Sequence, residues 1–157
     1  MPNVTINRTK SYLAMIRNAA AGENRMFRSL IASVDGVESD ILKDGALSCA
    51  FFASAILYIN KLIGDVHAGV PGLERDLAAS GWQQISDLRE GAVIAWEAQK
   101  GSFVPGMGEE HGHIGFYIGN DRAVSNGSNT SHVPEEHHVT YDGTRKIVRI
   151  WWHAELE

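Results

Sequence analysis

The sequence predicts an α+β fold in which N-terminal helices pack on a mostly antiparallel sheet of about five strands. Two observations carry this prediction: apolar residues follow helical spacing up to about residue 80, and beyond residue 81 they alternate as in strands. Elements segregated along a chain in this way form two layers, with the helices on one face of the sheet. A chain of 157 residues is long enough for one such core, so we expect a single domain over residues 1–157.

Helical segments are expected at four places before residue 81. Residues 9–21 have apolar positions at helical spacing and end at Gly22, and residues 25–34 repeat the pattern as a helix or helical turn until Asp35-Gly36. A polar loop over residues 38–45 leads into the most apolar helix, residues 48–63, which ends at Gly64. A short helix over residues 73–80 completes the set.

The strands of the predicted sheet follow in order after Gly81. Their expected ranges are 82–85, 92–96, 114–118, 123–126 and 144–153. Asn120-Asp121 is typical of a tight turn and joins the third and fourth strands as a hairpin. Residues 99–110 and 126–136 are polar or rich in Gly and Pro, and both are expected to be loops.

Composition and charge exclude several classes of function. A net charge of −5 without any basic block argues against nucleic acid as a partner, since phosphate binding requires clustered Lys and Arg. No apolar run is long enough to span a bilayer, so no membrane span is expected. The first residues lack a charged leader followed by an apolar core, which predicts synthesis in the cytoplasm without a signal peptide. If the protein acts outside the membrane, it must leave by another route. The oligomeric state is left open.

Cys49, the one cysteine of the chain, begins the most apolar helix. It has no partner for an internal disulfide. The free N–H groups and partial positive charge at a helix N-terminus favour a thiolate, so Cys49 is a candidate nucleophile. His113 lies at the start of a predicted strand and is the candidate base.

The order of these segments resembles the NlpC/P60 and CHAP families of papain-like cysteine hydrolases. The resemblance lies in the cysteine helix, the strand within residues 88–96, and residues 112–119 (GHIGFYIG) with the hairpin that follows, and it covers about residues 45–126. Ser48 stands where those families have Asp before the cysteine. The resemblance implies a papain-like fold with a catalytic core at about residues 40–153, and an amidase or endopeptidase that cleaves peptidoglycan peptides.

By this resemblance Cys49 is the nucleophile and His113 the base. A third polar residue on the strand paired with His113 orients the imidazole in those families. Ser125 takes that place if the hairpin has the usual length, and Asn126 does if the turn is one residue longer. We expect Asn126, because an amide oxygen accepts a hydrogen bond from the imidazole N–H more firmly than a hydroxyl does, as in Cys-His-Asn enzymes.

Other readings of the sequence are a zinc site, a different enzyme activity and a binding protein. Glu109, Glu110, His111 and His113 form a cluster that His137-His138 or His67 would have to complete for zinc. A convincing further ligand is missing, so we expect no metal and no cofactor. The same fold also serves effectors that cleave or deamidate proteins, and members without catalysis that bind the wall or a partner.

Overall fold

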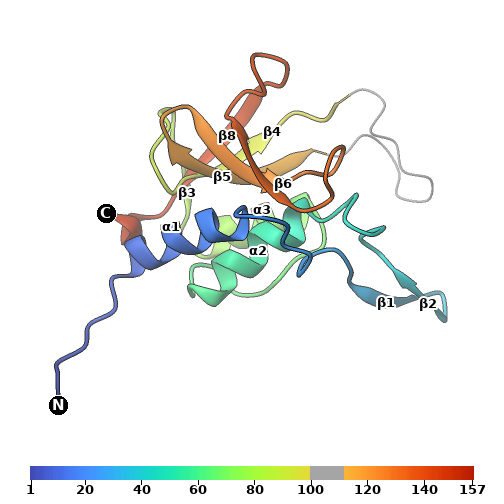
Figure 1. Cartoon of the computed structure of the whole chain (residues 1–157), viewed down its shortest axis with the longest axis horizontal. Helices are drawn as coiled ribbons and strands as arrows, with labels where there is room; N and C mark the ends of the chain where they lie inside the picture. Colours follow the sequence, from blue (N-terminus) through green and yellow to red (C-terminus); the bar gives the residue numbers. More distant parts are fainter. Residues whose placement is uncertain (100–111) are drawn as a thin grey trace.

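The structure, a computed structural model, describes residues 1–99 and 112–157 and has the predicted α+β fold. A six-stranded antiparallel sheet has the strand order β3-β8-β4-β5-β6-β7, and three helices cover one side of it (Figure 1). The helices are α1 (Arg8–Ala19), α2 (Cys49–Ile59) and α3 (Val70–Ala79). The strands of the sheet are β3 (Gln83–Gln84), β4 (Val93–Trp96), β5 (His113–Gly119), β6 (Arg122–Asn126), β7 (Pro134–His138) and β8 (Ile147–Trp152).

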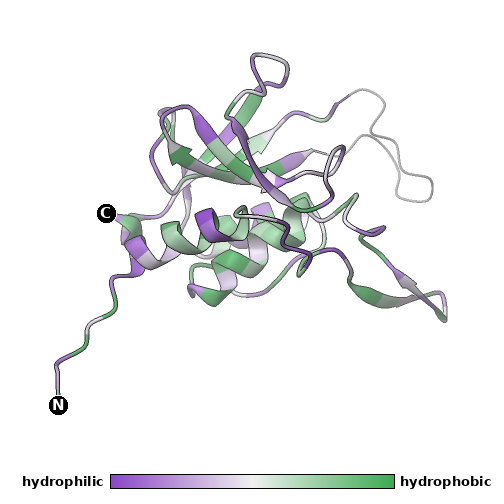
Figure 2. Ribbon diagram, in the orientation of Figure 1, coloured by the Kyte–Doolittle hydropathy of each residue, from purple (hydrophilic) through white to green (hydrophobic). Residues whose placement is uncertain are grey.

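The main core lies between the helices and the sheet. Helix α2 is apolar along most of its length and packs on β5 (Figure 2). Phe52 of α2 and Tyr12 of α1 both meet Phe116 of β5 edge to face, with ring centroids 5.8 Å apart in each pair. The Tyr12 hydroxyl donates a 2.8 Å hydrogen bond to the Gly91 carbonyl, so this buried phenol is satisfied.

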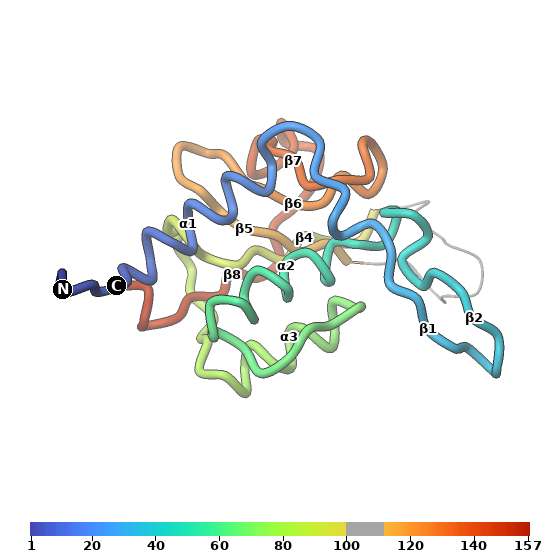
Figure 3. Tube along the Cα trace, turned by 60° about the horizontal axis from the view of Figure 1, so that its bottom comes forward, coloured from blue at the N-terminus to red at the C-terminus, as the bar shows by residue number. Residues whose placement is uncertain are grey.

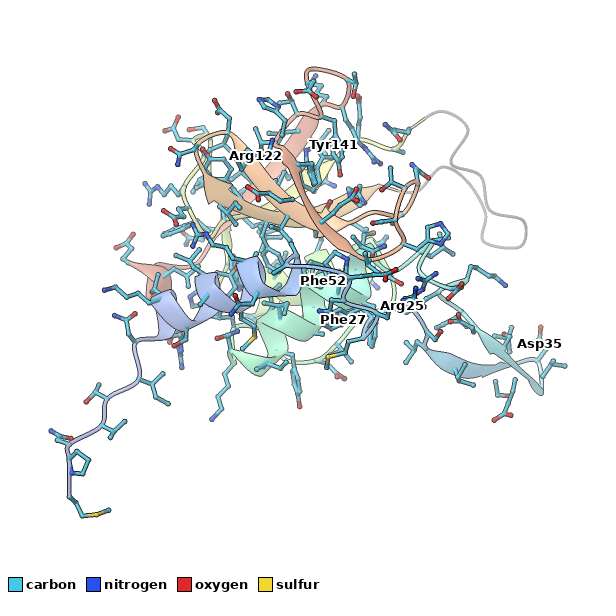
Figure 4. All side chains as sticks on the ribbon, in the orientation of Figure 1. Arg25, Phe27, Asp35, Phe52, Arg122 and Tyr141 are labelled. Atoms are coloured by element: carbon cyan, nitrogen blue, oxygen red, sulfur yellow. The ribbon has the colours of Figure 1, made fainter. Side chains whose placement is uncertain are left out.

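A second, smaller core covers the opposite face of the sheet. Trp96 of β4 lies at its centre and is 1% exposed, and its indole N–H donates to the Val139 carbonyl at 2.7 Å. Tyr141 packs against this cluster, on the far side of the sheet from Phe52 (Figure 4). Side chains alternate along a strand, so residues of β5 that do not face the helices enter this second cluster.

The prediction of a helix over residues 25–34 is wrong: residues 26–27 form only a turn, and the second half is a strand. Residues 31–34 form strand β1 (Ile31–Val34), which pairs with β2 (Val37–Asp40) as a hairpin that projects from the rest of the fold (Figure 3). Asp35 and Gly36 both have positive φ, at 51° and 82°, as a type I′ turn requires. This turn chemistry prevails over the helical spacing of the apolar residues, most of which are exposed.

The main sheet has one strand more than the five expected. Strand β7 begins within the segment predicted as a polar loop, extends two residues beyond it, and pairs with β6 along its whole length. Its sequence, Pro-Glu-Glu-His-His, is suited to an edge strand, where proline and charged residues discourage further pairing. Within residues 1–99 and 112–157, no helix is both long and apolar enough to cross a membrane. Predictions for residues 100–111, which include most of one expected loop, lie outside the described residues.

Candidate active site

Cys49 is the first residue of α2 and its side chain is 9% exposed. Ser48 occupies the N-cap position but makes no capping hydrogen bond, and its buried hydroxyl has no partner within the described residues. Burial raises the pKa of the Cys49 thiol, while the backbone N–H groups of Ile114 and Ala50 act in the opposite direction. The sulfur therefore lies against the start of β5 as well as against its own helix N-terminus.

His113 begins β5 and is paired with Trp96 of β4. The imidazole is 4% exposed, and its centroid lies 5.3 Å from that of the Trp96 ring. Because the Ile114 N–H faces the Cys49 sulfur, the structure brings Cys49 and His113 together at one end of the sheet, where α2 and β5 both begin (Figure 1). These two residues are the predicted nucleophile and base.

The Ser125 hydroxyl is the hydrogen-bond partner of His113. Ser125 Oγ lies 2.9 Å from His113 Nε2, 2.7 Å from His137 Nε2 and 3.0 Å from the Tyr141 hydroxyl. Gly115 leaves room for this contact, because a Cβ atom there would lie 2.7 Å from the Ser125 Cβ. The Tyr141 ring also stacks on His137, with centroids 4.0 Å apart, so the hydroxyl lies within a packed cluster of rings.

The hydrogen-bond partners around Ser125 determine which nitrogen of the His113 and His137 imidazoles carries the proton. His137 Nδ1 lies 2.8 Å from the His138 carbonyl, which can only accept, so in the neutral ring Nδ1 carries the proton and Nε2 accepts from Ser125. The single Ser125 proton is thereby used, and the oxygen must accept from His113 Nε2–H and from the Tyr141 hydroxyl. His113 therefore keeps Nδ1 unprotonated and available as a base. One proton and two lone pairs of Ser125 are all used.

Asn126, expected to orient His113, does not do so in this structure. Its side-chain amide donates to the Gly45 carbonyl at 2.7 Å and to Ser128 Oγ at 3.2 Å. Ser125 pairs with Gly115 across the hairpin and shares the face of His113, so its neighbour Asn126 lies on the opposite face. Asn126 instead ties β6 to the loop that leads into Cys49.

Both histidines of this cluster are held in the neutral form. Burial lowers the pKa of His113 well below its usual value of 6.5, and the positive charge of Arg145 lowers it further. Burial also lowers the pKa of His137. Burial raises the pKa of Tyr141 to about 12, so its hydroxyl stays a donor at neutral pH. The resting site thus contains a thiol and a neutral base, and the groups hydrogen-bonded in series to that base, Ser125, His137 and Tyr141, are uncharged as well.

The free energy of unfolding is expected to fall as the pH drops below about 6.5, the usual imidazole value. The pKa values of His113 and His137 are depressed in the folded state, so in this range the unfolded chain binds more protons. Each proton contributes a slope of up to about 1.4 kcal/mol per pH unit. Urea unfolding between pH 4.5 and 7.5 measures this slope, and the variant carrying both His113→Gln and His137→Gln should show a smaller one. An unchanged slope in that variant would mean that other groups cause the loss.

The histidines and carboxylates form no metal site in the part of the chain that the structure describes, where no three of His, Cys, Asp and Glu are grouped to hold an ion. His67, a possible zinc ligand from the sequence, instead lies 2.7 Å from a carboxylate oxygen of Asp76 on α3. Glu109, Glu110 and His111 lie outside the described residues.

His137 and Tyr141 are the members of the cluster that sequence reasoning missed as a site. The adjacent pair His137-His138 was the available signal, because alternation along a strand directs one of the two rings to each face. No protein-family model matches the chain, and no curated protein matches it either. The geometry around Cys49 and His113 is therefore the ground on which a function can be proposed.

Proposed function

We propose that the chain is a papain-like cysteine amidase or endopeptidase of the NlpC/P60 and CHAP type that hydrolyses amide bonds in peptidoglycan peptides. The observation that carries the proposal is the placement of Cys49 at a helix N-terminus, against the start of the strand that carries a neutral, hydrogen-bonded His113. The order of elements supports it, because a cysteine helix precedes β4, β5 and the hairpin to β6 as in those families.

The first half of the proposed reaction forms an acyl-enzyme. Cys49 Sγ attacks the carbonyl carbon of the amide while its proton moves to His113 Nδ1. The negative oxygen of the tetrahedral intermediate is stabilised by N–H groups at the start of α2. His113 then gives the proton to the leaving nitrogen, the C–N bond breaks, and a thioester on Cys49 remains.

The second half returns the enzyme to its resting state. His113 removes a proton from water, the hydroxide attacks the thioester, and the carboxylic acid product leaves as the thiol is restored. Throughout, Ser125 holds Nε2 of His113 in the protonated form, so that Nδ1 is the nitrogen free to take up and release the proton. The positive charge that forms on His113 is opposed by burial, which keeps its lifetime short and favours transfer of the proton onward.

Purified peptidoglycan is the substrate that tests the proposal. Incubation with the protein is expected to release or shorten stem peptides, each cleavage adding one water and exposing one amine and one carboxylate. Mass spectrometry of the soluble and glycan-bound fragments identifies the bond. The Cys49→Ala variant prepared in parallel should give no such fragments. If wild-type protein leaves the peptides intact, the substrate class is wrong, and labelling of Cys49 then distinguishes an enzyme acting on proteins from a binding protein.

A further inference from the structure

Arg145 is a buried arginine beside the candidate active site. It follows the turn after Tyr141 and is 7% exposed. Its Nε donates a 2.9 Å hydrogen bond to the Glu97 carbonyl, and its guanidinium carbon lies 5.9 Å from the centroid of the Tyr141 ring. These contacts fix the plane of the guanidinium and leave its two terminal nitrogens for other partners.

No carboxylate within residues 1–99 and 112–157 forms an ion pair with Arg145. Seven other arginines of the chain have such a partner; they are Arg8, Arg17, Arg25, Arg28, Arg89, Arg122 and Arg149. Glu97, whose charge acts on Arg145, forms no ion pair with it and instead accepts a hydrogen bond from the backbone N–H of Lys146 at its carboxylate. A buried charge without a counterion is costly, and the described residues supply no carboxylate paired with Arg145, so the terminal nitrogens are suited to bind an anion.

The guanidinium and the reacting groups share one cluster. Tyr141, which lies under Arg145, donates to Ser125 and has its ring centroid 6.2 Å from that of His113. The positive charge of Arg145 also acts on the titration of both Cys49 and His113, in each case toward the less protonated form. An anion bound to the terminal nitrogens would therefore lie in the same cluster as Tyr141 and His113.

We propose that Arg145 binds a carboxylate of the substrate next to the amide bond that is cut, so that the site selects acidic peptides. This inference rests on the proposed function for the hydrolysis, but not for the binding of the anion. A guanidinium suits a carboxylate because its terminal N–H groups donate in the geometry of the two oxygens. The carboxylate also supplies a counterion that the buried charge lacks among residues 1–99 and 112–157.

Two thiol reagents of nearly equal size test this directly, because iodoacetate carries a carboxylate and iodoacetamide does not. In both cases the Cys49 sulfur displaces iodide from the same carbon, so the ratio of the two alkylation rates reports recognition of the anion. We expect Arg145→Met to lower the iodoacetate-to-iodoacetamide ratio about tenfold or more, and Arg145→Lys, which keeps the charge but not the paired N–H donors, to lower it by a smaller factor. Arg25→Met removes an exposed arginine with equal loss of charge and should leave the ratio unchanged.

The competing role for Arg145 is to stabilise the thiolate. In that case Arg145→Met would slow both reagents by the same factor and leave the ratio as in the wild type, which would overturn the proposal. If circular dichroism shows that Arg145→Met is unfolded, Arg145→Lys keeps the proposal falsifiable. An iodoacetate-to-iodoacetamide ratio equal to that of wild type in Arg145→Lys would show that the guanidinium does not bind the carboxylate.

Paired peptides give a second readout that separates this proposal from the proposed function. One peptide carries a free carboxylate beside the cleaved amide and the other a carboxamide. In Arg145→Met, KM for the first should rise about tenfold while KM for the second stays within twofold. If the wild type cleaves neither peptide but shows the predicted alkylation ratio, the hydrolase is refuted and the anion site stands. Equal changes for both peptides would refute the anion site alone.

Discussion

Replacing Cys49 with alanine is expected to abolish hydrolysis, lowering kcat by about 10⁴-fold or more. The sulfur is the atom that forms the thioester, and the other groups of the site only hold or move protons around it. The side chain is small and 9% exposed, so the cost in the free energy of unfolding should be about 1 kcal/mol or less. Release of stem peptides and urea unfolding of the same preparation measure the two effects.

Ser54→Ala is the matched control for this variant. Ser54 lies in the same helix; its hydroxyl accepts from the His67 N–H at 2.8 Å, and its one proton is shared between the Phe51 and His67 carbonyls, each 3.2 Å away. Losing these contacts should cost about 1 kcal/mol of stability and leave kcat near that of wild type. Hydrolysis by Cys49→Ala at a rate close to that of the control would show that the cysteine is structural.

Replacing Ser125 with alanine should lower kcat about 10²-fold, the lower end of the contribution of a positioned general base. Without the hydroxyl, His113 Nε2 loses its acceptor and the ring is free to carry its proton on Nδ1, which cannot then accept the proton of the thiol. His137→Phe should lower kcat by a smaller factor, about tenfold, because Ser125 remains but its proton has no fixed acceptor. Steady-state kinetics on the same peptide compare the variants.

Tyr141→Phe is the control for the Ser125 variants. It removes a donor to the same oxygen but leaves the path from His113 through Ser125 to His137 intact, so its effect on kcat should stay within about threefold. Because Ser125 and His137 act through each other, the double variant should be no slower than Ser125→Ala alone. Additive losses would show that His137 acts independently of Ser125.

The sequence predicts those parts of the site that local patterns of apolar and polar residues determine. Helical spacing and its breakers place Cys49 at the start of α2, and alternation places His113 at the start of β5. The identity of the third residue of the site depends on the register of the hairpin, which is a less local property of the chain. Asn120 and Asp121 both have positive φ, as in a two-residue turn, and Gly119 pairs with Arg122. A register shift between Tyr117 and Gly119 then places Ser125, rather than Asn126, opposite Gly115 and on the face of His113.

Hydrogen-bonding strength alone favours Asn126 over Ser125 as the partner of His113. An amide is a firmer acceptor than a hydroxyl, but a strand residue can act only on the face to which it is directed. A hydroxyl can accept from His113 when a second group takes its own proton, and His137 does so from β7. That strand escaped prediction because edge strands carry the proline and charged residues that are otherwise typical of loops. Likewise, nothing in the spacing along the chain connects Arg145 with a cysteine 96 positions earlier.

The rate at which iodoacetamide modifies the folded protein at neutral pH tests the central claim, that Cys49 is a nucleophile activated by His113. We predict a single adduct, mapped to Cys49 by peptide mass analysis, that forms at least about tenfold more slowly in His113→Gln than in wild type. A folded wild-type protein that stays unmodified, or equal rates in the two proteins, would contradict this account.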